Sequence, residues 1–441
     1  MRSACALTFP SDTEGKVILF STKTAAAVLV PARLVEDIER GALEPDEERQ
    51  LADLGLLVPD RETEHREMLA FVSELEAAAD TLHLIVIAAH SCNLGCTYCY
   101  QGSAKGTGVI SPAVSAQVID FATAAAFDRG LNLKVTFYGG EPLLALEPIV
   151  SLAGALREAA AAHGCDFTFS LITNGTLLTR KTAARLRPLG LLAAQVTLDG
   201  PAHIHDAQRP LRAGGGSFRR ILGNLQEAWD LLTVRINANY GRDGYEACPG
   251  LLDDLLAVGL GPERIGSVSF SPISRERRAP GFEGGCRSAN EPWVIAAAAF
   301  LRGEALRRGY RVDAVRPGVC MVDLAHELVV DCDGSLYKCP CFAGDRRFCV
   351  GDVAAGVRDA PGAAYGRDRW RNETCLACPY LPLCFGGCRW ESCQADDDAA
   401  ALACRRPFFD AALGALVRQD LAHPLAARRI AAIPYRPGWT S

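Results

Sequence analysis

Residues 83–100 read HLIVIAAHSCNLGCTYCY, and this stretch decides how the rest of the chain is interpreted. Its first seven residues form a nearly unbroken apolar run, which is typical of a parallel strand buried on both faces. Three cysteines, Cys92, Cys96 and Cys99, follow with gaps of three and two residues. Three thiolates at this spacing can wrap one loop around a [4Fe–4S] cluster and leave one iron without a protein ligand, whereas a structural zinc site needs four ligands. The stretch therefore predicts an open-iron cluster placed directly after a strand.

Strands of the same apolar kind alternate with longer helical stretches across residues 81–310. Ser111 and Thr179 each precede a helical stretch and are residue types that favour helix starts. Six such repeats predict an α/β fold, a six-stranded and partly open β/α barrel with its chemistry at the carboxyl ends of the strands. The expected strands are 83–89, 133–138, 167–173, 193–198, 233–239 and 266–271. The expected helices are 112–129, 147–163, 180–188, 217–231, 245–258 and 291–308.

Short polar motifs end the second, third and fourth expected strands. They are Gly139-Gly140-Glu141-Pro142, Thr173-Asn174-Gly175-Thr176 and Thr197-Leu198-Asp199-Gly200. Two adjacent glycines would let backbone carbonyls approach a cationic amine, and Glu141 would add negative charge beside it.

The cysteine spacing, the aromatic Tyr98 before the last cysteine and the Gly-Gly-Glu-Pro motif together resemble the radical S-adenosylmethionine (SAM) enzymes. The resemblance implies that SAM chelates the open iron and that a 5′-deoxyadenosyl radical then abstracts a hydrogen atom from the substrate. No catalytic side chain is assigned. The alternatives are that Arg209 only forms an ion pair with Asp206, and that His203 and His205 are structural. The implied cofactor-binding residues are Tyr98, Gly139, Gly140, Glu141, Pro142, Asn174, Thr197 and Arg209.

The chain has 18 cysteines, of which eleven lie between Cys320 and Cys404. Residues 311–410 show little hydrophobic periodicity, so this segment can build only a small core. We expect bound metal clusters to stabilise its fold. Seven of the eleven match the spacing of the SPASM extension of radical SAM enzymes. They are Cys320, Cys339, Cys375, Cys378, Cys384, Cys388 and Cys404, with Gly386-Gly387 before Cys388.

The SPASM resemblance implies two auxiliary [4Fe–4S] clusters, for three clusters in all. Cys375, Cys378, Cys384 and Cys404 would bind the distal one. Cys320, Cys339 and Cys388 would bind the nearer one, which is then one ligand short. Cys332, Cys341 and His326 are candidates for that ligand, or the iron is open. A zinc ribbon over 375–388 remains an alternative, and the roles of Cys349 and Cys393 stay open.

Residues 1–80 read as three strands followed by three helices, the layout of a winged-helix-like module. The expected strands are 4–9, 16–22 and 26–31, and the expected helices are 32–40, 45–54 and 61–79. This layout resembles the leader-peptide recognition modules of peptide maturases, which often bind by adding a strand to a sheet edge. The alternative is a domain that only packs on the barrel. Residues 411–441 are expected to form a C-terminal helix and tail.

Motifs along the whole chain resemble the peptide maturases with SPASM domains, most closely the geopeptide maturases. These motifs include FYGGEPLL, VTLDGPA, GSLYKCP and YLPLCFGGCR. The resemblance implies modification of a ribosomally made precursor peptide, with flavodoxin or ferredoxin as electron donor. Our first hypothesis for the reaction is oxidative cross-linking, through a thioether or carbon–carbon bond, and epimerisation is the runner-up.

Other classes of function remain open at this stage. Anaerobic sulfatase maturases carry an Asp directly after the cysteine equivalent to Cys339, and this chain has Pro340 there, which weighs against sulfatase maturation. A non-enzymatic zinc- or peptide-binding protein is the remaining alternative.

The composition predicts the compartment and the excluded partners. The 441 residues carry a net charge of −6, which argues against nucleic-acid binding. No apolar run is long enough for a membrane span, and the first 30 residues lack the order of a signal peptide. We therefore expect a cytoplasmic protein whose cysteines stay out of disulfides.

Overall fold

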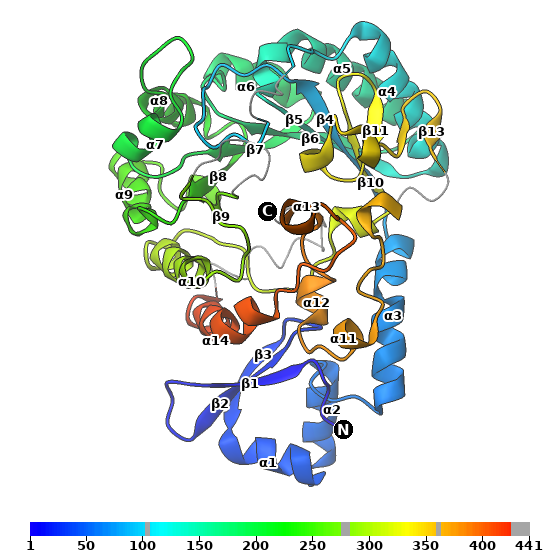
Figure 1. The fold of residues 1–441 in the computed structure, drawn as a ribbon, viewed down its shortest axis with the longest axis vertical. Coiled ribbons are helices and arrows are strands. Elements are labelled where there is room, and N and C mark those ends of the chain that lie inside the picture. Colours follow the sequence, from blue (N-terminus) through cyan, green and yellow to red (C-terminus); the bar gives the residue numbers. More distant parts are fainter. Residues whose placement is uncertain (102–105, 275–282, 359–362, 425–441) are drawn as a thin grey trace.

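A computed structural model describes residues 1–101, 106–274, 283–358 and 363–424. The N-terminal module (residues 1–80) lies at one end of the long axis and the barrel at the other, with the cysteine-rich segment from residue 311 between them (Figure 1). The predicted tail, residues 425–441, lies outside the described residues.

Six parallel strands form the barrel sheet in chain order, as the sequence predicts. They are β4 (Thr81–Ala89), β5 (Asn132–Gly139), β6 (Phe167–Thr173), β7 (Leu191–Thr197), β8 (Thr233–Tyr240) and β9 (Ile265–Pro272). Within β4, Leu84 and the run from Val86 to Ala89 have no exposed surface. This explains the unbroken apolar run, because both faces of the strand are covered.

Helices connect the barrel strands close to the expected bounds. Ser111 and Thr179 cap two of them, since their side chains accept hydrogen bonds from the amides of Val114 and Thr182. Short 3-10 turns interrupt two predicted helices, at Phe127–Arg129 and Tyr245–Ala247. The helices are α4 (Pro112–Ala125), α5 (Leu146–Ala162), α6 (Arg180–Leu186), α7 (Ala202–Gln208), α8 (Phe218–Ala228), α9 (Pro249–Ala257) and α10 (Pro292–Arg307), of which α7 was not expected.

A hairpin of the cysteine-rich segment extends the barrel sheet, which the sequence did not predict. Its first strand, β10 (Glu327–Val330), pairs in parallel with β4, and β11 (Ser335–Tyr337) pairs antiparallel with β10. The short strands β12 (Gly351–Asp352) and β13 (Gly356–Val357) follow, so that the sheet has ten strands among the described residues. The carboxyl ends of β4 and β10 therefore lie side by side.

The rest of the cysteine-rich segment has little regular structure. Its helices are α11 (Glu373–Leu376), α12 (Leu381–Cys384), α13 (Arg389–Asp396) and α14 (Arg406–Ala422), and the last begins before the expected boundary at residue 411. A buried ion pair holds the segment together, because Arg389 donates to both carboxylate oxygens of Asp323 at 2.7 and 2.5 Å.

The N-terminal module has the predicted order of elements. Its strands, β1 (Ala6–Pro10), β2 (Lys16–Ser21) and β3 (Ala27–Pro31), form an antiparallel sheet with β2 in the centre. Its helices are α1 (Ala32–Arg40), α2 (Pro45–Asp53) and α3 (Arg61–Ala77). Leu19 faces a core with α1 and α2, whereas Ile18 and Phe20 pack with residues of α14.

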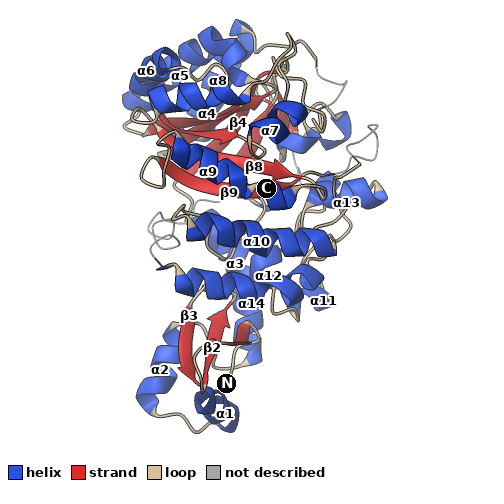
Figure 2. Ribbon diagram, turned by 90° about the vertical axis from the view of Figure 1, so that its left-hand side faces the viewer, coloured by secondary structure: helices blue, strands red, loops and turns tan. Residues whose placement is uncertain are grey.

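Two helices join the module to the rest of the chain. α14 lies between the N-terminal sheet and α10 (Figure 2), and Arg302 of α10 forms an ion pair with Asp420 of α14. α3 runs along the cysteine-rich segment, where the ring of Phe71 stacks on Phe385 at 5.4 Å and Trp370 meets Phe385 edge-on. Within the described ranges, no helix combines the length and apolar character needed to cross a bilayer.

Replacing Phe385 with alanine should destabilise the junction between α3 and the cysteine-rich segment. Phe385 is fully buried, and removing a buried phenylalanine side chain costs about 3–5 kcal/mol. We expect a clear fall in melting temperature by circular dichroism. L256A, which truncates an exposed leucine, should leave it nearly unchanged, and an equal melting temperature for both variants would contradict the packing described.

Candidate active site at the carboxyl ends of the barrel strands

The cysteine loop, residues 90–101, follows β4 and is tied to the segment after α7. The amide of Gly95 donates to the Pro210 carbonyl and the amide of Thr97 to the Gln208 carbonyl, both at 2.9 Å. All three predicted thiols lie on this loop. Burial raises the pKa of Cys96, and the neighbouring thiols of Cys99 and Cys92 raise it further.

The turn Gly139-Gly140 holds the cysteine loop in place. The amide of Gly140 donates to the Ala89 carbonyl, and the amide of Glu141 donates to the Ser91 carbonyl, both at 2.9 Å. A Cβ on Gly140 would lie 2.5 Å from the Ser91 oxygen, and one on Gly139 would overlap the Ala89 carbonyl. The glycines are thus required by the approach of two backbone segments, a reason that the sequence did not reveal.

Glu141 has no exposed surface and organises the end of β6. Its carboxylate accepts hydrogen bonds from the amides of Leu143 (3.0 Å) and Asn174 (2.8 Å) and from the hydroxyl of Thr173 (2.8 Å). Desolvation raises its pKa, and these donors oppose the shift. Pro142, also buried, begins the short 3-10 turn that Glu141 caps.

Asn174 links the end of β6 to the cysteine loop. Its side-chain amide donates to the Oδ1 of Asn93 at 2.8 Å and lies 3.8 Å from the sulfur of Cys92. Hydrogen bonds to cysteine sulfur are one way in which proteins tune the potential of an iron–sulfur cluster.

A buried polar group surrounds Tyr98. Its hydroxyl donates to Asp199 and accepts hydrogen bonds from Arg209 at 2.7 Å and from Asn239 at 3.0 Å. Arg209 also forms an ion pair with Asp199 at 3.9 Å, and the backbone amide of Asn239 donates to Asp199. Asn239, near the end of β8, was missed because no neighbouring motif marks it.

The surroundings of His205 settle two alternatives left open by the sequence. Buried His205 accepts a hydrogen bond from the Asp199 amide, and burial lowers its pKa to about 3, so it is neutral and structural. Asp206 accepts from the amides of Ser217 and Phe218 at the start of α8. The pairing of Arg209 with Asp206 is therefore wrong, because Arg209 pairs with Asp199. His203 is exposed.

These residues fit a polar, zwitterionic cofactor. Arg209 Nε and Gln208 Oε1 are buried and have no hydrogen-bond partner among the described residues. Unpaired buried donors and acceptors are costly unless a ligand satisfies them. Thr197 lies at the carboxyl end of β7, beside Asn237 of β8. The donor set thus suits a molecule with carboxylate and amino groups, such as SAM.

The nearer thiol group consists of Cys320, Cys339, Cys388 and Cys341. Burial raises the pKa of Cys388 to about 12, and the neighbouring thiols of Cys339 and Cys320 raise it further. A hydrogen bond with Cys341 is the main cause that raises the pKa of Cys339. Cys341 is therefore the candidate fourth ligand that the structure brings to this group.

The other two candidates lie elsewhere. The thiol of Cys332 donates to the Ile87 carbonyl at 3.1 Å, at the barrel's side of the hairpin. Burial lowers the pKa of His326, whose strongest charged neighbours are Glu327 and Lys338. Sequence position could not separate these candidates from Cys341. The choice depends on the pairing of β10 with β4, a tertiary contact that places Cys332 beside the barrel.

The outer thiol group consists of Cys375, Cys378, Cys384 and Cys404. Burial raises the pKa values of Cys375 and Cys378, and the neighbouring thiols of Cys384 and Cys404 raise both further. The turn at Gly387 allows a close backbone approach beside this group, because a Cβ there would overlap the Ala403 carbonyl next to Cys404.

A pair of tyrosines separates the cysteine loop from the nearer thiol group. The hydroxyls of Tyr100 and Tyr138 are hydrogen-bonded at 2.7 Å. Burial raises the pKa of Tyr138, and the thiols of both groups, Cys341 and Cys99, raise it further. Tyr138 therefore lies near a thiol of each group, Cys99 of the cysteine loop and Cys341 of the nearer thiol group.

Comparisons with known proteins agree with this geometry. Residues 86–240 match the Radical SAM superfamily. The serine-type anaerobic sulfatase-maturating enzyme of Klebsiella aerogenes is 24% identical over 328 residues, 68% of this chain and 77% of that enzyme. Mycofactocin maturase MftC of Mycobacterium ulcerans is 27% identical over 328 residues, 68% of this chain and 80% of that protein. Protein MJ0907 of Methanocaldococcus jannaschii is 31% identical over 168 residues, but the chain spans only 54% of its length.

Solved structures share the fold. The anSMEcpe structure with bound AdoMet superposes with a TM-score of 0.63 at 20% identity, over 77% of this chain and 98% of that chain. The structure of Streptococcus suis SuiB bound to its precursor peptide SuiA superposes with a TM-score of 0.54 at 15% identity, over 92% of this chain and 98% of that chain.

Residues 86–240 thus form a radical SAM domain, and the chain is a SAM-dependent radical enzyme. Its relatives by sequence include a sulfatase-maturating enzyme and a mycofactocin maturase. Members of this superfamily use SAM together with a [4Fe–4S] cluster, and the cysteine loop offers the thiols for one.

Replacing Gly140 with alanine should disrupt the cysteine loop, because the added Cβ meets the carbonyl oxygens of His90 and Ser91. We expect the iron content of the reconstituted protein to fall by about four atoms per chain, the content of one cluster. Iron assays and electron paramagnetic resonance would measure this loss. G154A is the matched control, since nothing lies within 4 Å of a Cβ there. Full iron loading of G140A would show that the turn at Gly139 and Gly140 does not hold the cysteine loop in place.

Proposed function

We propose that this enzyme modifies a ribosomally made precursor peptide and that the reaction is an oxidative cross-link. The carrying observation is that Tyr138, hydrogen-bonded to Tyr100 of the cysteine loop, lies near thiols of both groups, Cys99 and Cys341. When bound, a [4Fe–4S] cluster at Cys92, Cys96 and Cys99 with SAM supplies a 5′-deoxyadenosyl radical that removes a hydrogen atom from the substrate.

The chain's own residues position that cofactor. The turn at Gly139 and Gly140 fixes the cysteine loop, and Glu141 fixes the end of β6 behind it. Arg209, held by Tyr98 and Asp199, would bind the carboxylate of the methionine moiety through its remaining donors. Asn174 would donate to the Cys92 sulfur and Thr197 would line the ribose side. Their burial keeps bulk water away from a reactive radical.

The nearer and outer thiol groups would each hold an auxiliary [4Fe–4S] cluster. We assign Cys320, Cys339, Cys388 and Cys341 to the nearer one and Cys375, Cys378, Cys384 and Cys404 to the outer one. When bound, these clusters supply an acceptor for the electron that a cross-link releases. Burial raises the pKa of Cys320, and a hydrogen bond with Cys341 together with burial raises that of Cys339. The charge of Arg389, which pairs with Asp323, opposes both shifts and would favour the thiolates.

The N-terminal module is proposed to bind the leader of the precursor peptide. Its strand β3 is an edge of the sheet, and Leu29 on it is 42% exposed. The opposite edge is partly occupied, because carbonyls of Ala6 and Pro10 in β1 accept hydrogen bonds from Arg2 and Arg418. A peptide strand would add to β3 by main-chain hydrogen bonds. The SuiB structure, solved with a precursor peptide, superposes over 92% of this chain, which supports this assignment.

Sulfatase maturation is the second candidate, and the Klebsiella aerogenes relative favours it. The residue after Cys339 counts against it, since Pro340 carries no carboxylate that could accept a substrate proton. Epimerisation of a peptide residue would need a hydrogen donor on the opposite face of the substrate. The reaction products separate the three outcomes.

A candidate precursor peptide, chosen from short open reading frames next to this gene, should lose two hydrogen atoms per modification when incubated anaerobically with reconstituted enzyme, SAM and reductant. High-resolution mass spectrometry checks this result. Unchanged mass with deuterium uptake from D2O would indicate epimerisation instead, and oxidation of a sulfatase peptide to formylglycine would indicate sulfatase maturation.

Reconstituted enzyme should hold about twelve iron atoms, and C341S should hold fewer than the control C349S.

L29E should weaken binding of the same peptide, because a charge on the edge strand opposes the apolar contact that a docked leader makes. We expect at least a tenfold rise in Kd by fluorescence anisotropy, about 1.4 kcal/mol. L192E alters a leucine of similar exposure on β7 and should bind normally. Equal affinity of the two variants would refute docking at β3.

A further inference from the structure

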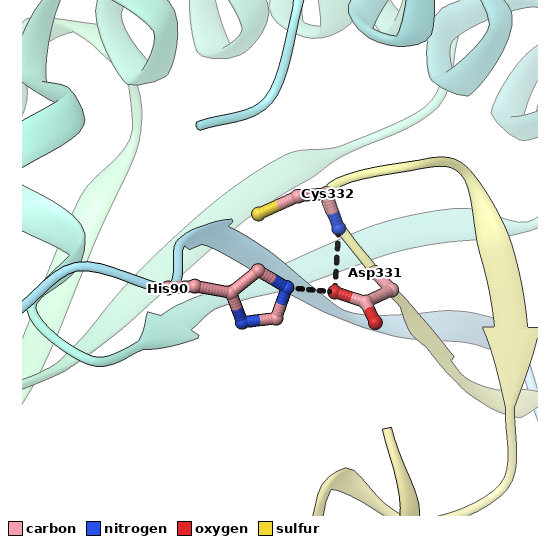
Figure 3. Close-up of side chains that lie close together, drawn as sticks. All are labelled: His90, Asp331 and Cys332. Carbon is pink, nitrogen blue, oxygen red and sulfur yellow. Dashed lines mark hydrogen bonds and ion pairs between the residues drawn. The ribbon is translucent and has the colours of Figure 1, made fainter. Parts of the chain in front are cut away.

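A second cluster of potential metal ligands lies outside both thiol groups, at the adjoining carboxyl ends of β4 and β10. His90 follows β4, and Asp331 and Cys332 follow β10 (Figure 3). One nitrogen, one oxygen and one sulfur ligand atom of these residues all lie within 4.8 Å of one another. Cys332 is not one of the seven cysteines that match the SPASM spacing, and the iron–sulfur clusters proposed above leave all three residues without a role.

From this arrangement we propose that His90, Asp331 and Cys332 bind a single Zn²⁺ ion, separate from the iron–sulfur clusters. Zn²⁺ accepts mixed nitrogen, oxygen and sulfur ligands in tetrahedral geometry, and three protein ligands leave a fourth position for water. Bonds of about 2.0–2.3 Å place tetrahedral ligand atoms about 3.3–3.8 Å apart, so the present separations need only small side-chain movements.

The present contacts show how the ligands are pre-arranged. His90 Nε2 lies 2.8 Å from Asp331 Oδ1, and the amide of Cys332 donates to the same oxygen at 2.7 Å. Asp331 and Cys332 are less than a tenth exposed, and His90 is about a quarter exposed. Zn²⁺ would replace the proton between His90 and Asp331 and the thiol proton that Cys332 donates to the Ile87 carbonyl, so binding releases two protons.

The site also has an entry path. A surface cavity of about 380 Å³ is lined by all three ligands together with Val109, Tyr337 and Arg346. The open coordination position can face this cavity, which would admit a hydrated ion. A bound Zn²⁺ would fasten the hairpin of the cysteine-rich segment to the start of the cysteine loop, two residues before Cys92.

Metal analysis of the full-length enzyme tests the proposal independently of peptide modification. Enzyme with its iron–sulfur clusters reconstituted is incubated with one equivalent of ZnCl₂, desalted and analysed by plasma mass spectrometry. We expect about one zinc per chain in the wild type and at least a fivefold loss in C332S and D331N. C349S, which alters a thiol outside the site, should retain zinc, and all variants should keep the wild-type iron content.

X-ray absorption at the zinc edge of the wild-type enzyme keeps the proposal falsifiable if a variant does not fold. We expect one sulfur and the remaining ligands nitrogen or oxygen. Three outcomes overturn the proposal: no retained zinc, zinc retained undiminished in C332S, or ligation by several sulfurs, which would place the ion in a vacated cluster site.

Discussion

Two backbone hydrogen bonds between the turn after β5 and the cysteine loop after β4 set the geometry on which the active site depends. They join Gly140 to Ala89 and Glu141 to Ser91, and they require a backbone approach that only glycine allows at positions 139 and 140. Because the loop is fixed here, the three thiols that it carries are held at the carboxyl ends of the barrel strands. The carboxylate of Glu141 then extends the same constraint to β6, since it accepts from Thr173 and Asn174.

The polar residues around the Gly139-Gly140 turn are buried or partly buried, and most of their polar atoms pair with another chain segment. Tyr98 of the cysteine loop contacts Asp199 after β7, Arg209 after α7 and Asn239 of β8. Such a network is stable only when its members are paired, because the low dielectric of the interior penalises every unpaired group. The unpaired Arg209 Nε and Gln208 Oε1 are thus the positions where a cofactor would complete the network.

The position of the cysteine-rich segment also depends on contacts with other parts of the chain. Its hairpin adds to β4, and its thiol Cys341 lies near Tyr138, as does Cys99 of the cysteine loop. α3 and α14 connect the segment to the N-terminal module through Phe385 and through Ile18 and Phe20 of β2. A precursor held at β3 would therefore be bound by a body that is packed continuously onto the catalytic end of the molecule.

The sequence by itself determined the six barrel strands, their order and most of the helices between them, and it singled out ten cysteines by their spacing. Local pattern carries this information, since apolar runs and cysteine spacing act over a few residues. Only the tertiary structure decided that Arg209 pairs with Asp199, that Cys341 joins the nearer thiol group, and that Cys332 turns to His90. These contacts join residues far apart in the chain, and the parallel pairing of β10 with β4 brings Cys332 to His90. Pairing of this kind depends on how whole surfaces pack, which no local pattern records.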